Sequence, residues 1–290
     1  MIKIVLKYTV NDDDAGKRVS TILRDKLNVS ARLLIKLKNN NCILVNKKTV
    51  YTSYEVQTGD CVEALIDFKE TDEILMQKMD LDILYEDEYI LAVNKPAGMV
   101  VHPSSYHPDN TLANGVKYYL NNDKKIRPIN RLDRDTSGIV LFAKNEYVQE
   151  AFLSVKPYKE YIAIINGNIT PEAETIDAPI ARKEGSIMER IVSEEGQRAI
   201  THYETVAKFD DYSMLKINIE TGRTHQIRVH LSYKGNPILG DTLYGNESEM
   251  ISRQALHAYR LFFIHPITKK QTEIIAPLPD DMKKLIHTLH

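Results

Sequence analysis

The chain has 290 residues, of which 43% are hydrophobic and 27% charged, and its formal net charge is −2. This composition is ordinary for a water-soluble globular protein, and the length suits two domains better than a single core. Because a nearly neutral chain produces no overall field that attracts a polyanion, contact with a nucleic acid would depend on a local concentration of basic residues.

Several classes of protein are excluded by features that the sequence lacks. No apolar run approaches the ~20 residues that span a membrane, and residues 1–6 lack the apolar core and cleavage site of a signal peptide. There is no P-loop and no dinucleotide-binding glycine pattern. Cys42 and Cys61 match no disulfide or zinc spacing, and His225 and His230 are poorly spaced for one metal ion. We therefore expect a cytoplasmic protein that uses neither a metal nor a cofactor.

Residues 1–67 predict a small unit with one basic face. Residues 2–10 alternate as a strand, a helical pattern begins at Val19, and Ser30 is a suitable N-cap for a second helix. A hairpin at 43–50 and a strand at 61–66 follow.

Basic residues concentrate in this unit. Nine of them lie between Lys17 and Lys48, against Asp25 alone. Such a face either contacts RNA phosphates or is simply solvated. The order of helices and hairpin resembles the alpha-L RNA-binding fold of a ribosomal small-subunit protein, which favours RNA. The candidate RNA contacts here are Arg32, Lys36 and Lys47.

Residues 68–80 are charged and lack a clear period, so we interpret them as a linker to a second domain at 81–290. In that domain we expect two strands joined by an acidic turn within 83–95, and further strands at 139–143, 158–166, 199–208, 212–220, 255–264 and 271–276. We expect helices at 112–120 and 145–155, one that opens from the polar turn beginning at Thr221 and stops at Gly235, and one from 280. Residues 168–198 are polar and are expected to be irregular. Because strands and helices do not alternate regularly, the prediction is an α+β domain with a mainly antiparallel mixed sheet flanked by helices and loops.

The segment Arg131-Leu132-Asp133-Arg134-Asp135-Thr136-Ser137-Gly138 places dense charge directly before the apolar strand at 139–143. Charges beside a core must be paired or solvated, so this segment is either a structural ion-pair cluster or a functional site. An aspartate acts as a nucleophile or as an acid or base when a partner controls its ionisation, and a guanidinium is a suitable partner.

Two other polar clusters contain possible partners for this aspartate. Arg228 lies on a predicted helix whose Ile227 and Leu231 face the core, so its side chain can reach inward. Tyr161 lies in an apolar strand, where its hydroxyl needs a partner. The plainer alternatives are a surface cation at Arg228 and a core residue at Tyr161.

Together these segments resemble the RluA-type pseudouridine synthases, the ribosomal large-subunit RNA branch. The resemblance is carried by Tyr85–Asp87 with Asn94–Pro103, by Arg131–Gly138, by Lys159–Tyr161, by Thr221–His230 with Gly240-Asp241 and Tyr244-Gly245, and by Leu256–Ala258 with Ala276-Pro277. One residue departs from the family pattern: Asn130 stands where the family usually has histidine. An amide can still form hydrogen bonds there.

The resemblance implies that the protein isomerises uridine to pseudouridine within RNA without a cofactor. It implies that Asp133 is the catalytic carboxylate, that Arg228 pairs with it, and that Tyr161 packs against a flipped-out uracil. Whether Asp133 attacks the sugar, adds to the ring or removes a ribose proton stays open. Further candidate RNA contacts are His102, Arg131 and Arg223. We expect a monomer acting on 23S-type ribosomal RNA, with transfer RNA as the alternative.

Two other functions fit parts of the sequence. The sequence Asp135-Thr136-Ser137-Gly138 also matches the active-site loop of aspartic proteases, but a pepsin-like chain needs a second such loop, and a retroviral-type chain is far shorter and has an apolar residue where this one has Arg134. A non-catalytic RNA-binding protein of the ribosome is the other alternative. The joint presence of Asp133, Tyr161 and Arg228 argues against it.

Overall fold

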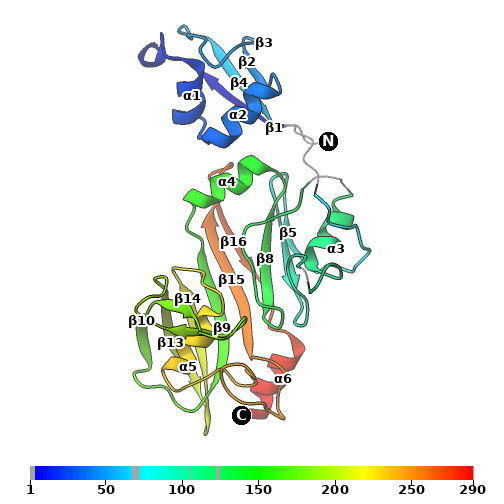
Figure 1. Cartoon of the computed structure of the whole chain (residues 1–290), viewed down its shortest axis with the longest axis vertical. Coiled ribbons are helices and arrows are strands. Elements are labelled where there is room, and N and C mark those ends of the chain that lie inside the picture. The colour runs from blue at the N-terminus through cyan, green and yellow to red at the C-terminus, as the bar shows by residue number, and fades with distance from the viewer. Residues whose placement is uncertain (1–3, 67–71, 105, 122–124, 290) are drawn as a thin grey trace.

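The computed structural model describes residues 4–66, 72–104, 106–121 and 125–289. Figure 1 shows an N-terminal unit, residues 4–66, at one end of an elongated molecule, and the C-terminal helix at the other end. A large sheet occupies the space between them.

The N-terminal unit is a four-stranded antiparallel sheet, in the order β1-β4-β2-β3, with two helices. Its elements are β1 (Ile4–Thr9), a 3-10 turn (Asp12–Asp14), α1 (Val19–Asp25), α2 (Ala31–Asn39), β2 (Ile43–Val45), β3 (Lys48–Thr49) and β4 (Cys61–Ile66). Leu33 and Leu37 of α2 are buried, and the Ser30 hydroxyl accepts a hydrogen bond from the Leu33 amide at 3.1 Å. The expected helices, cap, hairpin and strand are all present.

The segment interpreted as a linker, 68–80, is only partly described, because 67–71 lie outside the described residues. Residues 72–80 contain no helix or strand but are bonded to α3 (Leu112–Tyr119). Asp72 forms an ion pair with Lys117, and the Leu75 carbonyl accepts a hydrogen bond of 2.9 Å from the Asn114 side chain. This part of the segment is therefore fixed to the second part of the chain.

The second part of the chain is organised by a ten-stranded sheet in the order β10-β13-β14-β9-β15-β8-β6-β5, with β16 paired to β15 and β7 paired to β8. The strands are β5 (Ile83–Glu86), β6 (Ile90–Lys95), β7 (Arg127–Pro128), β8 (Ser137–Ala143), β9 (Tyr158–Asn166), β10 (Ala173–Asp177), β13 (Ile200–Lys208), β14 (Tyr212–Ile219), β15 (Leu256–Ile264) and β16 (Gln271–Ile275). The helices beside it are α3, α4 (Glu146–Ser154), α5 (Gln226–Tyr233) and α6 (Asp280–Leu289). The described pairs in this sheet are antiparallel except β15 with β8, which confirms the predicted mainly antiparallel α+β class.

Strand β8 forms the centre of the core, and all seven of its residues are buried. It runs parallel to β15 at Ser137 and Gly138, directly after the charged segment. Gly138 has φ +113°, and a Cβ atom there would lie 2.2 Å from the Ala258 carbonyl oxygen. Only glycine therefore permits this close approach of the two backbones.

The expectation for 168–198 was wrong. This segment contains β10 and a separate hairpin of β11 (Ile180–Arg182) and β12 (Arg190–Val192). These strands are short and bury few side chains, chiefly Ile176 and Ile180, so they lack the apolar alternation that identifies a strand. Pairing with β13, a long-range contact, supplies the backbone hydrogen bonds of β10.

Candidate active site

Asp133 lies in the turn that leads from β7 into β8, and 27% of its side chain is exposed. The Thr136 amide donates a hydrogen bond to the Asp133 carbonyl at 3.2 Å, which closes the turn. The carboxylate therefore stands at the edge of the core, partly open to solvent.

Asn130 is hydrogen-bonded to β8 and fixes the segment that leads to this turn. Its side-chain oxygen accepts a hydrogen bond from the Leu141 amide at 2.8 Å, and its side-chain nitrogen donates to the Ile139 carbonyl at 3.0 Å. The amide thus forms the two bonds that a neighbouring strand would otherwise form with β8. This residue ties the approach to Asp133 to the buried strand.

Arg228 reaches Asp133 from α5. Its Nη1 donates to Asp133 Oδ2 at 3.2 Å, while its Nε and Nη2 donate to the two carboxylate oxygens of Asp241 at 2.7 Å each. Burial acts to lower the pKa of the Arg228 guanidinium, but the carboxylates of Asp241 and Asp133 outweigh it and raise that pKa. The guanidinium stays charged and is shared by two acids.

Asp241 belongs to the Gly240-Asp241 pair of the family motif but was not among the predicted site residues. Its side chain is fully buried, and one oxygen also accepts hydrogen bonds from the amides of Leu243 and Tyr244 at 3.1 Å each. Gly240 before it has φ +74° and lies so close to the chain that a Cβ atom would be 2.3 Å from the Arg253 carbonyl oxygen. The Gly240-Asp241 pair was the sequence feature that could have identified this residue. A glycine with positive φ indicates a turn, and an aspartate in a turn often accepts hydrogen bonds from the backbone amides that follow it.

Tyr244 and His225 complete the surroundings of Arg228. The Arg228 guanidinium lies over the Tyr244 ring at 5.1 Å, and the Tyr244 hydroxyl is 2.8 Å from His225 Nδ1. His225 Nε2 is 3.9 Å from Asp133 Oδ2. Because that hydroxyl accepts a hydrogen bond from the Arg190 amide, it is free to donate to Nδ1, which favours the tautomer with its proton on Nε2. Burial lowers the pKa of His225, although the Asp133 charge opposes this.

Tyr161 lies on β9, is 7% exposed and is near enough to Asp133 for that charge to act on its phenol. Burial, together with the charge of Asp133, raises the pKa of its phenol well above the usual value. The phenol is therefore protonated at neutral pH.

Lys95, at the end of β6, is fully buried beneath the Asp133 turn. Its ammonium donates to the carbonyls of Pro96, Met99 and Arg134 at 2.8, 2.7 and 2.8 Å. Burial lowers the pKa of Lys95 to about 7, although the charges of Asp135 and Asp133 oppose this. Lys95 thus ties the 96–99 loop to the residue that follows Asp133.

A family model described as RNA pseudouridylate synthase matches residues 89–233, a range that includes Asp133, Tyr161 and Arg228. The chain is also 40% identical over 272 residues to a Bacillus subtilis protein named uncharacterized RNA pseudouridine synthase YjbO, covering 90% of this chain and 95% of that one. The chain belongs to the RNA pseudouridylate synthase family. The expected membership is confirmed, and the protein is an RNA pseudouridine synthase, an isomerase that acts on RNA.

Two further relatives extend the comparison. The synthase is 34% identical over 308 residues to ribosomal large subunit pseudouridine synthase D of Zymomonas mobilis, covering 98% of this chain and 97% of that one. It matches the solved structure of human RNA pseudouridylate synthase domain containing 1 with a TM-score of 0.58 and 25% identity, over 72% of this chain and 94% of that one.

The remaining candidate RNA contacts of the synthase fall into two groups. His102, Arg131 and Arg223 are exposed in the second part of the chain, where Arg223 donates to the Gln197 side chain at 2.9 Å. Arg32, Lys36 and Lys47 belong to the N-terminal unit, at the end of the molecule beyond α4 (Figure 1). Arg32 and Lys36 contact Glu146 of α4, and Lys47 is exposed in the turn between β2 and β3.

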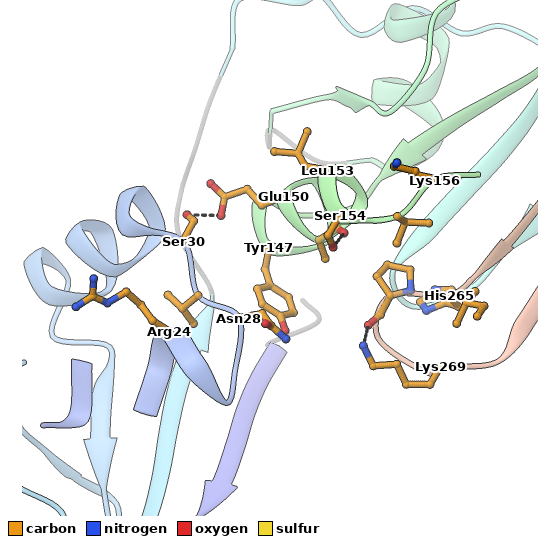
Figure 2. Close-up of a pocket in the computed structure, with 15 residues that line it drawn as sticks. Arg24, Asn28, Ser30, Tyr147, Glu150, Leu153, Ser154, Lys156, His265 and Lys269 are labelled. Carbon is orange, nitrogen blue, oxygen red and sulfur yellow. Dashed lines mark hydrogen bonds between the residues drawn. The ribbon is translucent and has the colours of Figure 1, made fainter. Parts of the chain in front are cut away.

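A cavity of about 830 Å³ in the synthase lies away from Asp133, between the N-terminal unit and α4 (Figure 2). None of its lining residues belongs to the cluster around Asp133.

Across the described ranges of the chain, no group of three or more His, Cys, Asp or Glu side chains is placed to hold a metal ion. Among the described helices, none is long and apolar enough to cross a membrane.

Proposed function

We propose that this synthase modifies uridines of large-subunit ribosomal RNA and that Asp133 is the carboxylate that acts on the nucleoside. The observation that carries the assignment is the 3.2 Å contact between Arg228 and Asp133. Arg228 holds the Asp133 carboxylate in place at the edge of the core, where a substrate would reach it. Neither the aspartic protease nor the non-catalytic alternative fits the family to which the chain belongs.

The reaction needs a carboxylate but no electron carrier. In forming pseudouridine, the bond between N1 and the ribose C1′ breaks and a bond from C5 to C1′ forms. C5 loses one proton and N1 gains one, so the change is an isomerisation. Asp133 would act as a nucleophile or as a base, and Arg228 would keep it oriented through both bond changes.

The target uridine would be flipped out of any helix. Asp133 lies among largely buried groups, and a stacked and paired base cannot bring its C1′ or C5 to such a carboxylate. Tyr161 would pack against the extruded uracil, and its protonated phenol would relay the C5 proton by passing its own proton to an acceptor such as the Asp133 carboxylate. His102, Arg131 and Arg223 would bind the RNA flanking the flipped nucleotide.

Ribosomal RNA is the favoured substrate because full-length relatives in Zymomonas mobilis and Xanthomonas campestris carry the name ribosomal large subunit pseudouridine synthase D. We infer an alpha-L-like RNA-binding domain at 1–67, a linker at 68–80 whose residues 72–80 are bonded to α3, and a catalytic domain at 81–290. The basic residues Arg32, Lys36 and Lys47 would serve that first domain. The enzyme would act in the cytoplasm, as a monomer.

The decisive experiment maps pseudouridine in total RNA from cells with and without this gene, using carbodiimide adducts and reverse-transcription stops. A large-subunit site should disappear in the deletion strain and return with the wild-type gene but not with Asp133→Asn. The melting temperature of purified Asp133→Asn should stay near that of the wild type. A map that changes only in transfer RNA would overturn the substrate, and full activity of Asp133→Asn would overturn the role of Asp133.

A further inference from the structure

Part of the basic face of α2 is in contact with an acidic face of α4. Lys36 Nζ lies 2.6 and 2.8 Å from the two carboxylate oxygens of Glu146, and Arg32 Nε lies 3.5 Å from the same carboxylate. The Glu146 side chain is only 5% exposed. Two of the three residues proposed to bind RNA in the N-terminal unit therefore already hold an anion.

A second carboxylate of α4 lies at the N-terminus of α2. The Ser30 hydroxyl donates to Glu150 Oε2 at 2.5 Å, as the dashed line in Figure 2 shows, while the same oxygen accepts from the Leu33 amide. An anion is favoured at this end of a helix because the first amides are unpaired. Glu146 and Glu150 are four residues apart, so they lie on one face of α4.

These two carboxylates present to α2 the chemistry of an RNA backbone. Each carries one negative charge and oxygen acceptors that suit lysine and arginine, as a phosphodiester does. One of them contacts basic side chains and the other lies at a helix N-terminus, which are both places where proteins bind phosphate.

The contact between α4 and the N-terminal unit combines a shared apolar cluster with polar pairs that border a cavity. The cavity of about 830 Å³ separates the two surfaces beside Ser30 and Glu150 (Figure 2). Arg24 and Lys156 line this cavity, and within the described part of the chain neither forms an ion pair. The Arg32 side chain is 72% exposed, so its pair with Glu146 is weak and screened by salt.

We propose that the face of α4 formed by Glu146 and Glu150 is an internal docking surface that occupies the basic face of α2 in the free enzyme, and that the phosphate backbone of RNA displaces it. This rests on the proposed RNA-binding role of the N-terminal unit. Displacement turns Lys36 and Arg32 from the carboxylates to phosphates and widens the cavity, beside which Arg24 and Lys156 are already exposed and can contact the same strand. The N-terminal unit then binds RNA only where RNA competes successfully with α4.

Affinity provides the first test. The full-length double variant Glu146→Gln/Glu150→Gln keeps the shape of both side chains and removes their charge. An internal competitor lowers the apparent affinity for RNA, because only molecules in which α4 has left α2 can bind. The variant should therefore bind a fluorescein-labelled 20-base-pair RNA duplex about three- to tenfold more tightly than the wild type. Asp210→Asn/Asp211→Asn, which changes the net charge equally at an exposed turn away from α4, should bind like the wild type. Equal affinities of the two double variants would overturn the proposal.

Fluorescence provides a direct test of opening. The chain contains no tryptophan, and Tyr147 of α4 is buried at this contact, with its hydroxyl donating to the Leu27 carbonyl at 3.0 Å. Tyr147→Trp is therefore a unique reporter, whose emission should shift to longer wavelength when the same duplex binds. In the Glu146→Gln/Glu150→Gln background, it should be shifted before RNA is added.

Pseudouridine formation on ribosomal RNA, measured with the same proteins, separates this proposal from the proposed function. If the enzyme modifies RNA while duplex binding leaves the emission unchanged and the double variant gains no affinity, the docking surface alone is wrong. If the wild type modifies no RNA, the proposed substrate is wrong, and the affinity and fluorescence results still decide whether α4 covers the basic face.

Discussion

Arg228 and Asp241 are joined by two hydrogen bonds of 2.7 Å, whereas Arg228 reaches Asp133 through a single nitrogen at 3.2 Å. Asp241 is fully buried and Asp133 is partly exposed. The guanidinium is therefore fixed by the buried acid and is presented, through its remaining nitrogen, to the partly exposed acid. Asp241 acts as a positioning residue for this pair.

Asp241→Asn should lower kcat by about 100-fold while KM changes little, because a displaced Arg228 orients Asp133 poorly but need not bind RNA. The buried guanidinium also loses a charged partner, so the free energy of unfolding should fall by about 3 kcal/mol. Steady-state kinetics and urea unfolding measure the two effects. As a control, Asp281→Asn removes the partner of Arg253 on α6 and should reduce stability with kcat within about threefold of the wild type. Similar kcat losses in both variants would show that Asp241 acts only through stability.

Tyr161→Phe should lower kcat by about 100-fold with little change in KM or melting temperature. The ring and its packing remain, but the variant has no hydroxyl beside Asp133 to take part in proton transfer, a contribution of about 100- to 10,000-fold. Release of tritium from uridine labelled at C5 follows this step directly. Wild-type tritium release by Tyr161→Phe would leave Tyr161 as a packing residue only.

Lys95→Met should destabilise the protein by about 3 kcal/mol, because the carbonyls of Pro96, Met99 and Arg134 lose their buried donor. Activity should fall further than the unfolded fraction explains, since Lys95 holds the loop that carries Asp133. Urea unfolding and single-turnover kinetics report the two losses. Lys183→Met, at a surface pair with Glu189, should change stability by less than about 0.5 kcal/mol.

Stability should fall as the pH falls from 6.5 to 4, because burial lowers the pKa of His257 from 6.5 to about 4. In this range the unfolded chain binds a proton at His257 and the folded chain does not, so protonation favours unfolding. The effect amounts to about 3 kcal/mol at pH 4 and is absent above pH 6.5. Urea unfolding at several pH values measures it, and His257→Gln should flatten the profile. If His257→Gln left the profile unchanged, His257 would have the same pKa in the folded and the unfolded chain.

Local patterns in the sequence predicted much of the secondary structure. The Ser30 cap and the buried Leu33 and Leu37 define α2 by short-range chemistry, and the apolar run of β8 identifies a core strand. The edge strand β10 and the hairpin of β11 and β12 escaped prediction because their partners, rather than their own residues, make them strands.

The sequence by itself determined the family, the α+β class and which residues were candidates for chemistry, since motifs and hydrophobic periodicity are local. Only the tertiary structure decided how those residues share their charges. Arg228 is 95 residues from Asp133 and Lys36 is 110 residues from Glu146, and both pairs meet because the sheet and α4 bring distant segments together. Spacing along the chain carries no information about such contacts, so neither Asp241 as the main partner of Arg228 nor α4 as the cover of the basic face could be read from the sequence.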